Sequence, residues 1–267
     1  MILKNDPEIA VLMPIYNPAD GLNECLDSLR AQTVKFRLFI VDDGSKKKVD
    51  YKSFTQGIDC KIIELPQNLG ITGAMNAGLA EIMKSNFKFI ARVDYPDLSD
   101  PTRFEKQMSF LKAHPDYCMV GSATNYLYAQ TGVTLPAKNP PSFEACVRTM
   151  RYNAPLTHGA IMFRTDFWRK LGAYTDQYPA AEDYAMECYA FAQGYKFANL
   201  PEQLYTTIEI QQSNSVVSRA KQLKSRLALQ WRYADWLSVH TYLGLLRTLV
   251  LMFGPANLLR RLKSLMS

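Results

Sequence analysis

The first half of the chain alternates between apolar stretches and amphipathic stretches. Residues 9–16 (IAVLMPIY) form a continuous apolar run, which is typical of a strand buried on both faces. Three further strands are predicted at residues 36–41, 60–65 and 87–93. Apolar residues recur at helical spacing in three stretches, at residues 22–29, 71–83 and 104–111. This alternation predicts an α/β fold with a mainly parallel sheet flanked by helices.

The pattern changes after Cys118. Three more strands are predicted at residues 157–163, 197–200 and 204–210, with a helix at residues 183–193. A long helix is predicted at residues 216–236, and residues 241–266 are apolar with interspersed arginines and a break at Gly254-Pro255. We therefore predict a domain at residues 1–215 and a basic amphipathic helical extension at residues 216–267.

Basic charge is concentrated in this extension. The 267 residues carry 31 Lys and Arg against 25 Asp and Glu, a net charge of +6. Residues 216–267 hold nine Lys or Arg against Asp235 alone, so this stretch carries +8 and residues 1–215 carry −2. Apolar residues make up 48% and charged residues 21%, a balance that indicates a folded globular protein rather than a disordered one.

The basic extension predicts contact with an anionic membrane surface. Its charges are interspersed with Trp231, Trp236, Tyr242 and apolar runs, a pattern that suits a helix lying in a membrane interface. The alternative is a helical cap on the first domain with a solvated basic face. Because the stretch has no recognised nucleic-acid-binding motif, we expect no nucleic-acid partner.

Cysteine usage and the absence of targeting patterns indicate the compartment. The 5 Cys contain no Cys-x-x-Cys pair, which disfavours a disulfide framework and a cysteine-rich zinc site. The first eight residues do not resemble a signal peptide, and there is no clean run of about 20 apolar residues. We therefore expect a cytoplasmic protein that lies peripherally at the inner face of the membrane.

Polar residues follow three of the predicted strands directly. They are Tyr16-Asn17, Asp42-Asp43 and Asp94. In open α/β sheets, ligands bind outside the carboxyl ends of the strands. The sequence therefore gathers carboxylate and amide groups where a ligand is expected.

Two of these features fit a nucleotide. The Asp43 carboxylate can accept hydrogen bonds from a base or a ribose, although Asp-Gly is also ordinary turn chemistry. Asn68 and residues 70–78 (GITGAMNAG) open a helix after a strand, and a helix N-terminus attracts phosphate. The alternative for these glycines is close packing of the helix on the sheet.

Carboxylates also suggest a metal site and a general base. Asp94 and Asp97 flank Tyr95-Pro96 at a strand end and could hold Mg²⁺ or Mn²⁺, or they could form a turn that caps the next helix. Glu182-Asp183 begins a helix, where a carboxylate serves either as a general base or as a simple helix cap. His158, before an apolar strand, is a structural histidine or a substrate contact.

Other catalytic chemistries are not supported. The three His, at positions 114, 158 and 240, lack metal-ligand spacing, and there is no Gly-x-Ser-x-Gly motif.

Taken in order, these segments resemble the inverting glycosyltransferases of family 2, which have the GT-A fold. The resemblance covers residues 9–215. Each segment is weak alone, but seven in one order are specific. They are VLMPIYNP (11–18), FIVDDGS (39–45), NLGITGAMNAGL (68–79), ARVDYPDLSDPTRFEKQ (91–107), HGAIMFR (158–164), LGAYTDQY (171–178) and AAEDYAMECYAFAQGYKFANLPEQLY (180–205).

The resemblance implies roles for individual residues. Asp183 matches the catalytic base of the family's Glu-Asp motif, and Asp43 matches the residue that hydrogen-bonds the base, uracil. The remaining nucleotide-sugar contacts implied are Tyr16, Asn17, Asn68, Asn76 and Asp94, with Glu182 and His158 as acceptor or donor contacts.

One departure concerns the metal. The family commonly reads Asp-Ala-Asp-Asp, with the third position as the principal metal ligand, whereas this chain has Pro96 there. Either Asp97 replaces it beside Asp94, or metal binding is weakened, or no metal is needed.

The function implied is transfer of a sugar from a nucleotide-sugar donor, a UDP-sugar, to a glycan or lipid-linked acceptor in surface polysaccharide or lipopolysaccharide biosynthesis. One alternative is a nucleotidyltransferase, but residues 17–20 (NPAD) lack the Gly-rich loop with Arg and Lys that such an enzyme needs after its first strand. The other is a non-catalytic nucleotide-sugar-binding or scaffold protein, which Pro96 favours.

Overall fold

The computed structural model describes residues 7–137, 139–209 and 219–253, which form two compact units. Unit 1 comprises Met1–Phe143, Leu156–Tyr174 and Tyr195–Ile210, and unit 2 comprises Glu144–Pro155, Thr175–Gly194 and Gln211–Ser267. Unit 2 thus contains two earlier stretches of chain besides the C-terminal helices. These units are groups of residues that pack together, and they do not test a boundary along the sequence. The domain boundary predicted at residue 215 therefore stays a prediction.

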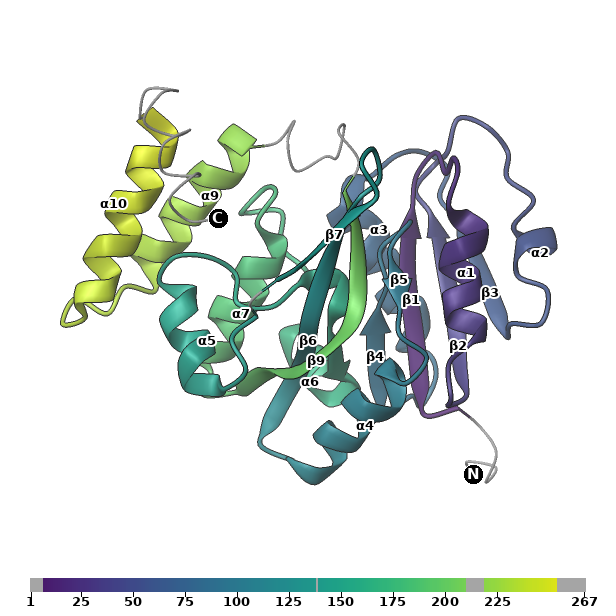
Figure 1. The fold of residues 1–267 in the computed structure, drawn as a ribbon, viewed down its shortest axis with the longest axis horizontal. Coiled ribbons are helices and arrows are strands. Elements are labelled where there is room, and N and C mark those ends of the chain that lie inside the picture. Colours follow the sequence, from purple (N-terminus) through teal and green to yellow (C-terminus); the bar gives the residue numbers. More distant parts are fainter. Residues whose placement is uncertain (1–6, 138, 210–218, 254–267) are drawn as a thin grey trace. The chain divides into compact units, whose positions relative to one another are not determined.

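Unit 1 is built on a mixed sheet of nine strands among the described residues. Their order is β3-β2-β1-β4-β8-β6-β9-β5, and β7 pairs with β6 (Figure 1). Strands β3, β2, β1 and β4 are parallel neighbours, whereas β8 runs antiparallel to both β4 and β6. The bounds are β1 Ile9–Ile15, β2 Phe36–Asp42, β3 Cys60–Glu64, β4 Phe89–Arg92, β5 Leu98–Ser99, β6 Tyr117–Tyr128, β7 Val133–Pro136, β8 Met162–Arg164 and β9 Lys196–Glu209.

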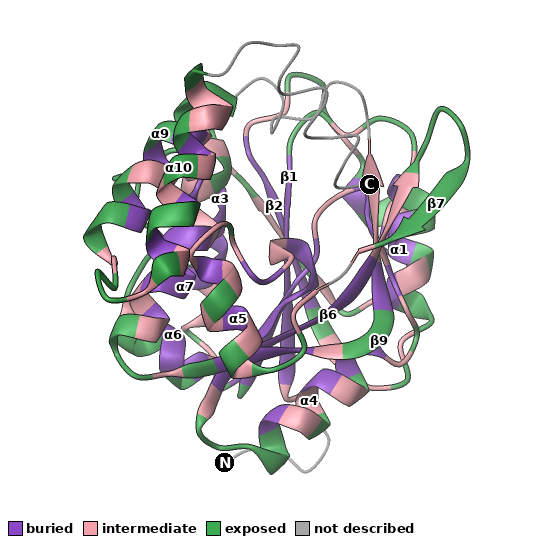
Figure 2. Cartoon of the chain, turned by 60° about the vertical axis from the view of Figure 1, so that its left-hand side comes forward, coloured by how far each residue is buried: buried purple, intermediate pink, exposed green. Residues whose placement is uncertain are grey.

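Both faces of β1, β2 and β4 are covered, as their largely apolar sequences predict, whereas the edge strand β3 has no buried residue. Successive side chains of a strand point to opposite faces. Val11 and Met13 of β1 join a core cluster with the apolar residues of α1 (Leu22–Arg30) and α4 (Arg103–Ala113). On the other face, α3 (Gly70–Ile82) packs so closely that a Cβ at Gly78 would lie 2.3 Å from a methyl of Leu12. Figure 2 shows β1 and β2 as buried.

The strands and helices predicted up to residue 111 are confirmed, whereas two later predictions need correction. The strand predicted at residues 157–163 is a short 3₁₀ helix, η1 (His158–Ala160), followed by β8. The carbonyl of Gly159 accepts from Arg103 and that of Ala160 accepts from Gln107, so side chains take the place of a sheet partner at these two residues. The Ile161 carbonyl accepts from both Arg103 and the Arg92 N–H of β4.

The two strands predicted at residues 197–200 and 204–210 are one strand, β9. Its register against β6 shifts between Leu200 and Gln203, where Pro201 lies. A proline cannot donate to a ladder and is tolerated at such an irregularity. Residue 210 lies outside the described residues.

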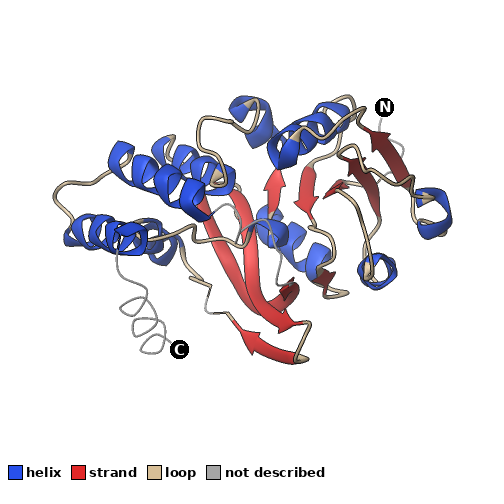
Figure 3. Ribbon diagram, turned by 90° about the horizontal axis from the view of Figure 1, so that it is seen from above, coloured by secondary structure: helices blue, strands red, loops and turns tan. Residues whose placement is uncertain are grey.

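The remaining helices are divided between the units. Unit 1 also contains α2 (Tyr51–Phe54) and α6 (Thr165–Leu171), and α5 (Phe143–Met150) begins at its boundary. Unit 2 contains α7 (Glu182–Ala192), α9 (Arg219–Arg232) and α10 (Val239–Phe253), drawn as blue helices in Figure 3. The predictions for residues 216–218 and 254–266 lie outside the described residues. Among the helices that the structure describes, none has the length and apolar character to cross a membrane.

We expect Gly44→Ala to destabilise the protein more than Gly57→Ala. Both glycines have positive φ, +69° and +80°, which costs an alanine about 1 kcal/mol. A Cβ at Gly44 would also lie 2.4 Å from the backbone carbon of Gln67, whereas at Gly57 nothing lies within 4 Å. Urea unfolding should therefore show an additional loss of about 1–3 kcal/mol for Gly44→Ala. Equal losses would mean that residues 67–68 can move away.

Candidate active site

Loops from different strands are tied together at the carboxyl edge of the unit 1 sheet. The Asn17 N–H donates to the hydroxyl of Ser45 at 2.8 Å, and the Lys46 N–H donates to the Asn17 side-chain oxygen at 2.8 Å. Asn17 has a φ of +47°, a conformation that asparagine tolerates better than most residues. Tyr16, beside it, is 40% exposed. The loop after β1 therefore has a fixed shape and presents Tyr16 to solvent.

A tyrosine after β4 fixes the same loop from the other side. The Tyr95 hydroxyl accepts from the Ala19 N–H at 2.8 Å and donates to the Asp20 carbonyl at 2.7 Å. The loop after β1 is thus hydrogen-bonded to the loops that follow both of its neighbouring strands, β2 and β4.

The two aspartates at the end of β2 have different partners. Asp42 accepts from the Ser45 N–H and the Tyr51 hydroxyl, each at 2.8 Å, so it shapes its own loop. Asp43 is 4% exposed and accepts from the Leu69 N–H at 2.7 Å, which holds the start of α3 against β2. Burial raises the pKa of Asp43, while hydrogen bonds from the backbone of Leu69 and Gly70 oppose the shift.

The two asparagines of the glycine-rich segment have different surroundings. Asn68 is exposed, and its side-chain oxygen accepts from the Gly70 N–H at 3.2 Å. Asn76 uses both ends of its amide on Tyr174, donating to the carbonyl at 3.1 Å and accepting from the N–H at 2.9 Å. Asn68 therefore lies at the surface beside Asp43, whereas Asn76 braces the chain after α6.

Asp94 is held by the arginine at the end of the preceding strand, β4. Arg92 Nε lies 2.7 Å from Oδ1 of Asp94, and an Arg92 terminal nitrogen lies 3.2 Å from Oδ2. The Arg92 side chain is 5% exposed and that of Asp94 is 33% exposed. Arg92 also contacts the ring of His158, whose Nε2 lies 2.8 Å from the Tyr174 hydroxyl. Burial, and then the Arg92 charge, hold the pKa of His158 well below its usual range, so this histidine is neutral at pH 7.

Asp97 lies deeper than Asp94. It is 6% exposed, and its Oδ1 accepts from the Ile208 N–H at 2.9 Å. Burial and the nearby Asp94 carboxylate raise the pKa of Asp97 to about 7. These surroundings favour a role in joining β9 to the loop after β4.

Glu182 and Asp183 begin α7 in unit 2, as predicted from the sequence. Both are partly exposed, and the Asp183 carboxylate accepts from the Tyr184 N–H at 2.6 Å. A carboxylate in this position is stabilised by the helix dipole.

The described residues provide a metal ion with few ligands of their own. They contain no group of three or more His, Cys, Asp or Glu that could hold one. Asp94 has a partly exposed carboxylate, whereas Asp97 is buried and bonded to backbone. Since Mg²⁺ and similar ions are commonly held by one or two carboxylates plus substrate phosphates, the residues present fit an ion held by Asp94 and a diphosphate.

Sequence reasoning missed Arg92 and Arg103. Arg103 is fully buried, and its guanidinium donates to the carbonyls of Arg92, Gly159 and Ile161. It also stacks 4.7 Å from the ring centre of Tyr205, whose hydroxyl accepts from the Asp94 N–H. One signal for Arg92 was available: residues two apart on a strand share a face, so Arg92 and Asp94 were placed to meet.

Comparison with known proteins identifies the family. The model of "Glycosyl transferase family 2" matches residues 10–171, more than half of the chain. The chain belongs to glycosyl transferase family 2. An uncharacterized glycosyltransferase of Haemophilus influenzae is 29% identical over 96% of this chain and 97% of its own length. The amylovoran biosynthesis glycosyltransferase AmsE of Erwinia amylovora is 30% identical over 73% of this chain and 74% of its own length.

A third relative has a more specific name. It is the UDP-Gal:alpha-D-GlcNAc-diphosphoundecaprenol beta-1,3-galactosyltransferase of Escherichia coli, 26% identical over 74% of this chain and 73% of its own length. The predicted family and enzyme class are thus confirmed: this family 2 protein is a glycosyltransferase, with relatives in polysaccharide biosynthesis.

Solved structures confirm the GT-A fold. S. aureus TarS 1-349 in complex with UDP-GlcNAc matches with a TM-score of 0.68 and 16% identity, over 90% of this chain and 71% of that one. The mannosyltransferase PcManGT from Pyrobaculum calidifontis, in complex with GDP-Man and Mn²⁺, matches with a TM-score of 0.67 and 16% identity, over 98% of this chain and 81% of that one.

We expect Asn76→Ala to lower the free energy of unfolding by about 1–3 kcal/mol, because it removes the two hydrogen bonds that the Asn76 amide makes with the backbone of Tyr174. Asn23→Ala is the matched control, since Asn23 is exposed on helix α1 and its replacement should change stability by less than about 0.5 kcal/mol. Urea unfolding measures both. An Asn76→Ala protein of normal stability that no longer bound a nucleotide would favour the role predicted from the sequence.

Proposed function

We propose that this family 2 glycosyltransferase moves a sugar, with inversion, from a UDP-sugar to a hydroxyl of a glycan or lipid-linked acceptor in surface-polysaccharide assembly. The observation that carries the proposal is the set of loops locked together at the carboxyl edge of β1, β2 and β4, with Asp43 and Asp94 among them. The E. coli relative, named for UDP-Gal and a diphosphoundecaprenol, supports the classes of donor and acceptor.

The nucleoside is assigned to the β1–β2 side of this edge. Tyr16 presents an exposed ring for the base or the ribose, and the fixed turn at Asn17 orients it. Asp43 accepts from the base, uracil, while its bond to the Leu69 N–H keeps it in place. Asn68, exposed beside it, faces the donor. Asn76 is assigned a supporting role in the site, because both ends of its amide are hydrogen-bonded to the backbone of Tyr174.

The diphosphate is assigned to Asp94 and Arg92 on the β4 side. Because β1 separates β2 from β4, Asp43 and Asp94 lie about two strand spacings, or ~10 Å, apart across the sheet. Arg92 orients Asp94 and adds a positive charge beside the leaving group. Asp94 would hold a Mg²⁺ or Mn²⁺ ion together with the diphosphate, and such an ion would stabilise the charge that develops on the leaving group. Asp97 has a structural role in this assignment.

Asp183 is assigned as the general base. It removes the proton of the acceptor hydroxyl as that oxygen attacks the anomeric carbon from the face opposite the diphosphate. The bond from the anomeric carbon to the diphosphate oxygen breaks, and the diphosphate leaves with the electron pair. One displacement of this kind inverts the configuration. Glu182 is assigned as an acceptor or donor contact, and so is His158, which is also hydrogen-bonded to Arg92 and Tyr174.

We expect Asp183→Asn to lower turnover by about 10²- to 10⁴-fold, because the amide cannot accept the proton. The affinity for UDP should stay within about twofold, since a base acts in the chemical step rather than in donor binding. Asp176→Asn is the control, because Asp176 is an exposed carboxylate seven residues earlier in the same unit. Transfer of labelled sugar measures turnover, and near-normal transfer by Asp183→Asn would remove this residue from the role.

We expect Mn²⁺ to raise the affinity for UDP by about 10- to 100-fold in the unmodified protein, and much less in Asp94→Asn, which removes the assigned metal-side carboxylate. Asp97→Asn should keep most of the effect, because Asp97 already accepts a backbone N–H. Calorimetry with UDP, with and without Mn²⁺, measures this. If Mn²⁺ raised the UDP affinity of Asp94→Asn as much as that of the unmodified protein, the metal would have to be assigned to other residues. If Mn²⁺ did not change the UDP affinity of the unmodified protein, this would argue for a metal-free reaction.

The alternatives left open by the sequence are separated by the same assays. A scaffold protein would bind UDP without transferring or hydrolysing a donor sugar. Membership in family 2 weighs against a nucleotidyltransferase. The expected location, cytoplasmic and peripheral at the inner face of the membrane, depends on a different surface, which lies in unit 2.

A further inference from the structure

Helices α9 and α10 of unit 2 form a hairpin in which the buried residues of α10 are small or polar, whereas α9 buries Leu223 and Leu229 beside Ser225 and Gln230. The buried residues of α10 are Thr241, Gly244 and Thr248. The Thr248 hydroxyl donates to the side-chain oxygen of Gln230 on α9 at 2.8 Å, and the Thr241 hydroxyl donates to the carbonyl of Asp235 at 2.8 Å. The inner side of α10 is therefore held by hydrogen bonds rather than by large apolar side chains.

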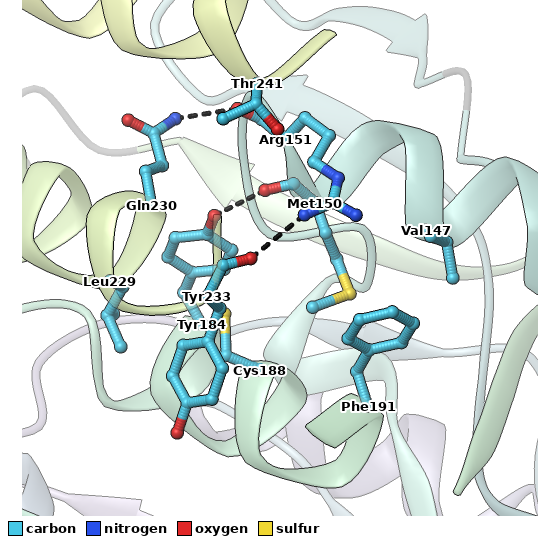
Figure 4. Close-up of a pocket in the computed structure, with 10 residues that line it drawn as sticks. All are labelled: Val147, Met150, Arg151, Tyr184, Cys188, Phe191, Leu229, Gln230, Tyr233 and Thr241. Carbon is cyan, nitrogen blue, oxygen red and sulfur yellow. Dashed lines mark hydrogen bonds between the residues drawn. The ribbon is translucent and has the colours of Figure 1, made fainter. Parts of the chain in front are cut away.

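The hairpin packs against Arg151 of the same unit and is hydrogen-bonded to it. Gln230 donates to the Arg151 carbonyl at 2.9 Å, and Arg151 in turn donates to the carbonyl of Tyr233 at 3.0 Å (Figure 4). A Cβ at Gly244 would lie 1.8 Å from that same Arg151 carbonyl, so α10 is pressed against the chain at this point. The adjoining cavity, about 20 Å³, has room for about one water molecule and no more. These contacts fix which side of α10 faces inward.

The outer side of α10 carries six large apolar residues, while Leu245, Val250, Leu251 and Met252 are partly buried. The six follow one another at helical spacing and are exposed, from 39% at Leu249 to 77% at Phe253. The stripe consists of Val239, Tyr242, Leu243, Leu246, Leu249 and Phe253. In a helix of a soluble domain this stripe faces the core, so the polarity of α10 is reversed. Figure 2 shows exposed positions along this helix.

Aromatic residues extend the apolar stripe at the turn of the hairpin. The rings of Trp231 and Trp236 lie 4.9 Å apart, and those of Trp236 and Tyr242 lie 6.1 Å apart. Next to them, Leu237 is 99% exposed. Trp and Tyr are enriched where apolar and aqueous phases meet, because their rings are apolar and their polar atoms need water.

The charge around the stripe has one sign. Helices α9 and α10 contain six Lys or Arg and no Asp or Glu, and the turn between them contributes only Asp235. Arg219, Lys221, Lys224 and Arg232 are exposed. A second copy of this surface would bring like charges together, whereas anionic headgroups would complement them.

We infer that the outer face of the α9–α10 hairpin, defined by the α10 stripe with Trp231, Trp236 and Leu237, docks on an anionic lipid bilayer. With 15 residues, α10 spans about 22 Å, which is shorter than the hydrocarbon core of a bilayer, so it lies in the interface rather than across it. The stripe enters the boundary between headgroups and acyl chains, and the exposed basic residues contact the headgroups. This inference is independent of the sugar and of the residues assigned to the reaction.

Flotation of the full chain with lipid vesicles tests the inference. Vesicles of phosphatidylcholine with about 30% phosphatidylglycerol should carry the protein at about 0.1 M salt, and binding should weaken at about 0.5 M salt. Leu243→Glu/Leu246→Glu should lower the partition coefficient at least about tenfold, because it places charge in the stripe. Lys221→Glu/Lys224→Glu should weaken binding to anionic vesicles by a similar factor.

Matched controls carry the same chemical changes in unit 1. Val133→Glu/Leu135→Glu alters two apolar residues of β7 that are 48% and 50% exposed, and Lys35→Glu/Lys52→Glu alters two exposed lysines. Neither should change vesicle binding. Circular dichroism confirms that each variant is folded, and UDP affinity without vesicles should be unchanged in all of them, so a failure here is distinct from a failure of the proposed reaction.

Three results would overturn the inference. The first is an unmodified protein that does not float with anionic vesicles. The second is an equal loss of binding in the β7 control, which would mean that any added charge has the same effect. The third is a stable dimer, measured by light scattering, that Leu243→Glu/Leu246→Glu dissociates, which would assign this face to a second copy of the chain.

Discussion

The buried guanidinium of Arg103 is the interaction on which the arrangement of the unit 1 site depends. Removing a charged side chain from water is costly unless hydrogen bonds replace the lost hydration. The Arg103 guanidinium donates hydrogen bonds to three carbonyls and to the hydroxyl of Ser99. The carbonyls are those of Arg92, Gly159 and Ile161. Burial lowers the pKa of Arg103 only to about 10, so it keeps its charge at neutral pH. One side chain of α4 thereby fixes the end of β4, the 3₁₀ turn and β5 together.

This interaction also determines where Asp94 lies. Tyr205 of β9 stacks on the Arg103 guanidinium and accepts the Asp94 N–H, while Arg92, whose carbonyl Arg103 binds, holds the Asp94 carboxylate. Backbone and side chain of Asp94 are therefore positioned separately by groups that converge on Arg103. A carboxylate in such a frame needs little rearrangement when a charged ligand binds, which is what electrostatic preorganisation requires.

The sequence was most informative where one physical rule dominates. Apolar runs gave the buried parallel strands β1, β2 and β4, because a strand covered on both faces must be apolar over most of its length. The rule for open α/β sheets placed Asn17, Asp43 and Asp94 at one edge. It was less informative where side chains compete with the sheet. The carbonyls of residues 159–161 are bonded by Arg103 and Gln107, a three-dimensional arrangement that no periodicity reveals, and the strand predicted there is a 3₁₀ turn.

The roles of individual polar side chains were harder still to predict from the sequence. Asn68 and Asn76 lie in one glycine-rich segment and were given the same nucleotide role, yet the amide of Asn76 is engaged with Tyr174, a residue 98 positions away. The glycine at position 78 illustrates the same limit: its sequence context suggested phosphate binding or packing, and the contact with Leu12 favours packing. Such roles depend on which long-range partner is present, which a single sequence does not contain.

Helices α1 and α10 show why periodicity indicates a helix without indicating its environment. Each has apolar residues at helical spacing. In α1 these residues, Leu22, Cys25, Leu26 and Leu29, are all buried. In α10 the buried positions are Thr241, Gly244 and Thr248, and the apolar stripe is exposed. The difference comes from what each helix packs against. The sheet gives α1 an apolar face, whereas α10 meets the Gln230 side chain, which accepts from Thr248, and the Arg151 carbonyl, which leaves no room for a side chain at Gly244. The inward side of α10 makes its hydrogen bonds within unit 2, so its apolar side is the one that faces outward. Because the surrounding charge is positive, a lipid interface with anionic headgroups suits this side.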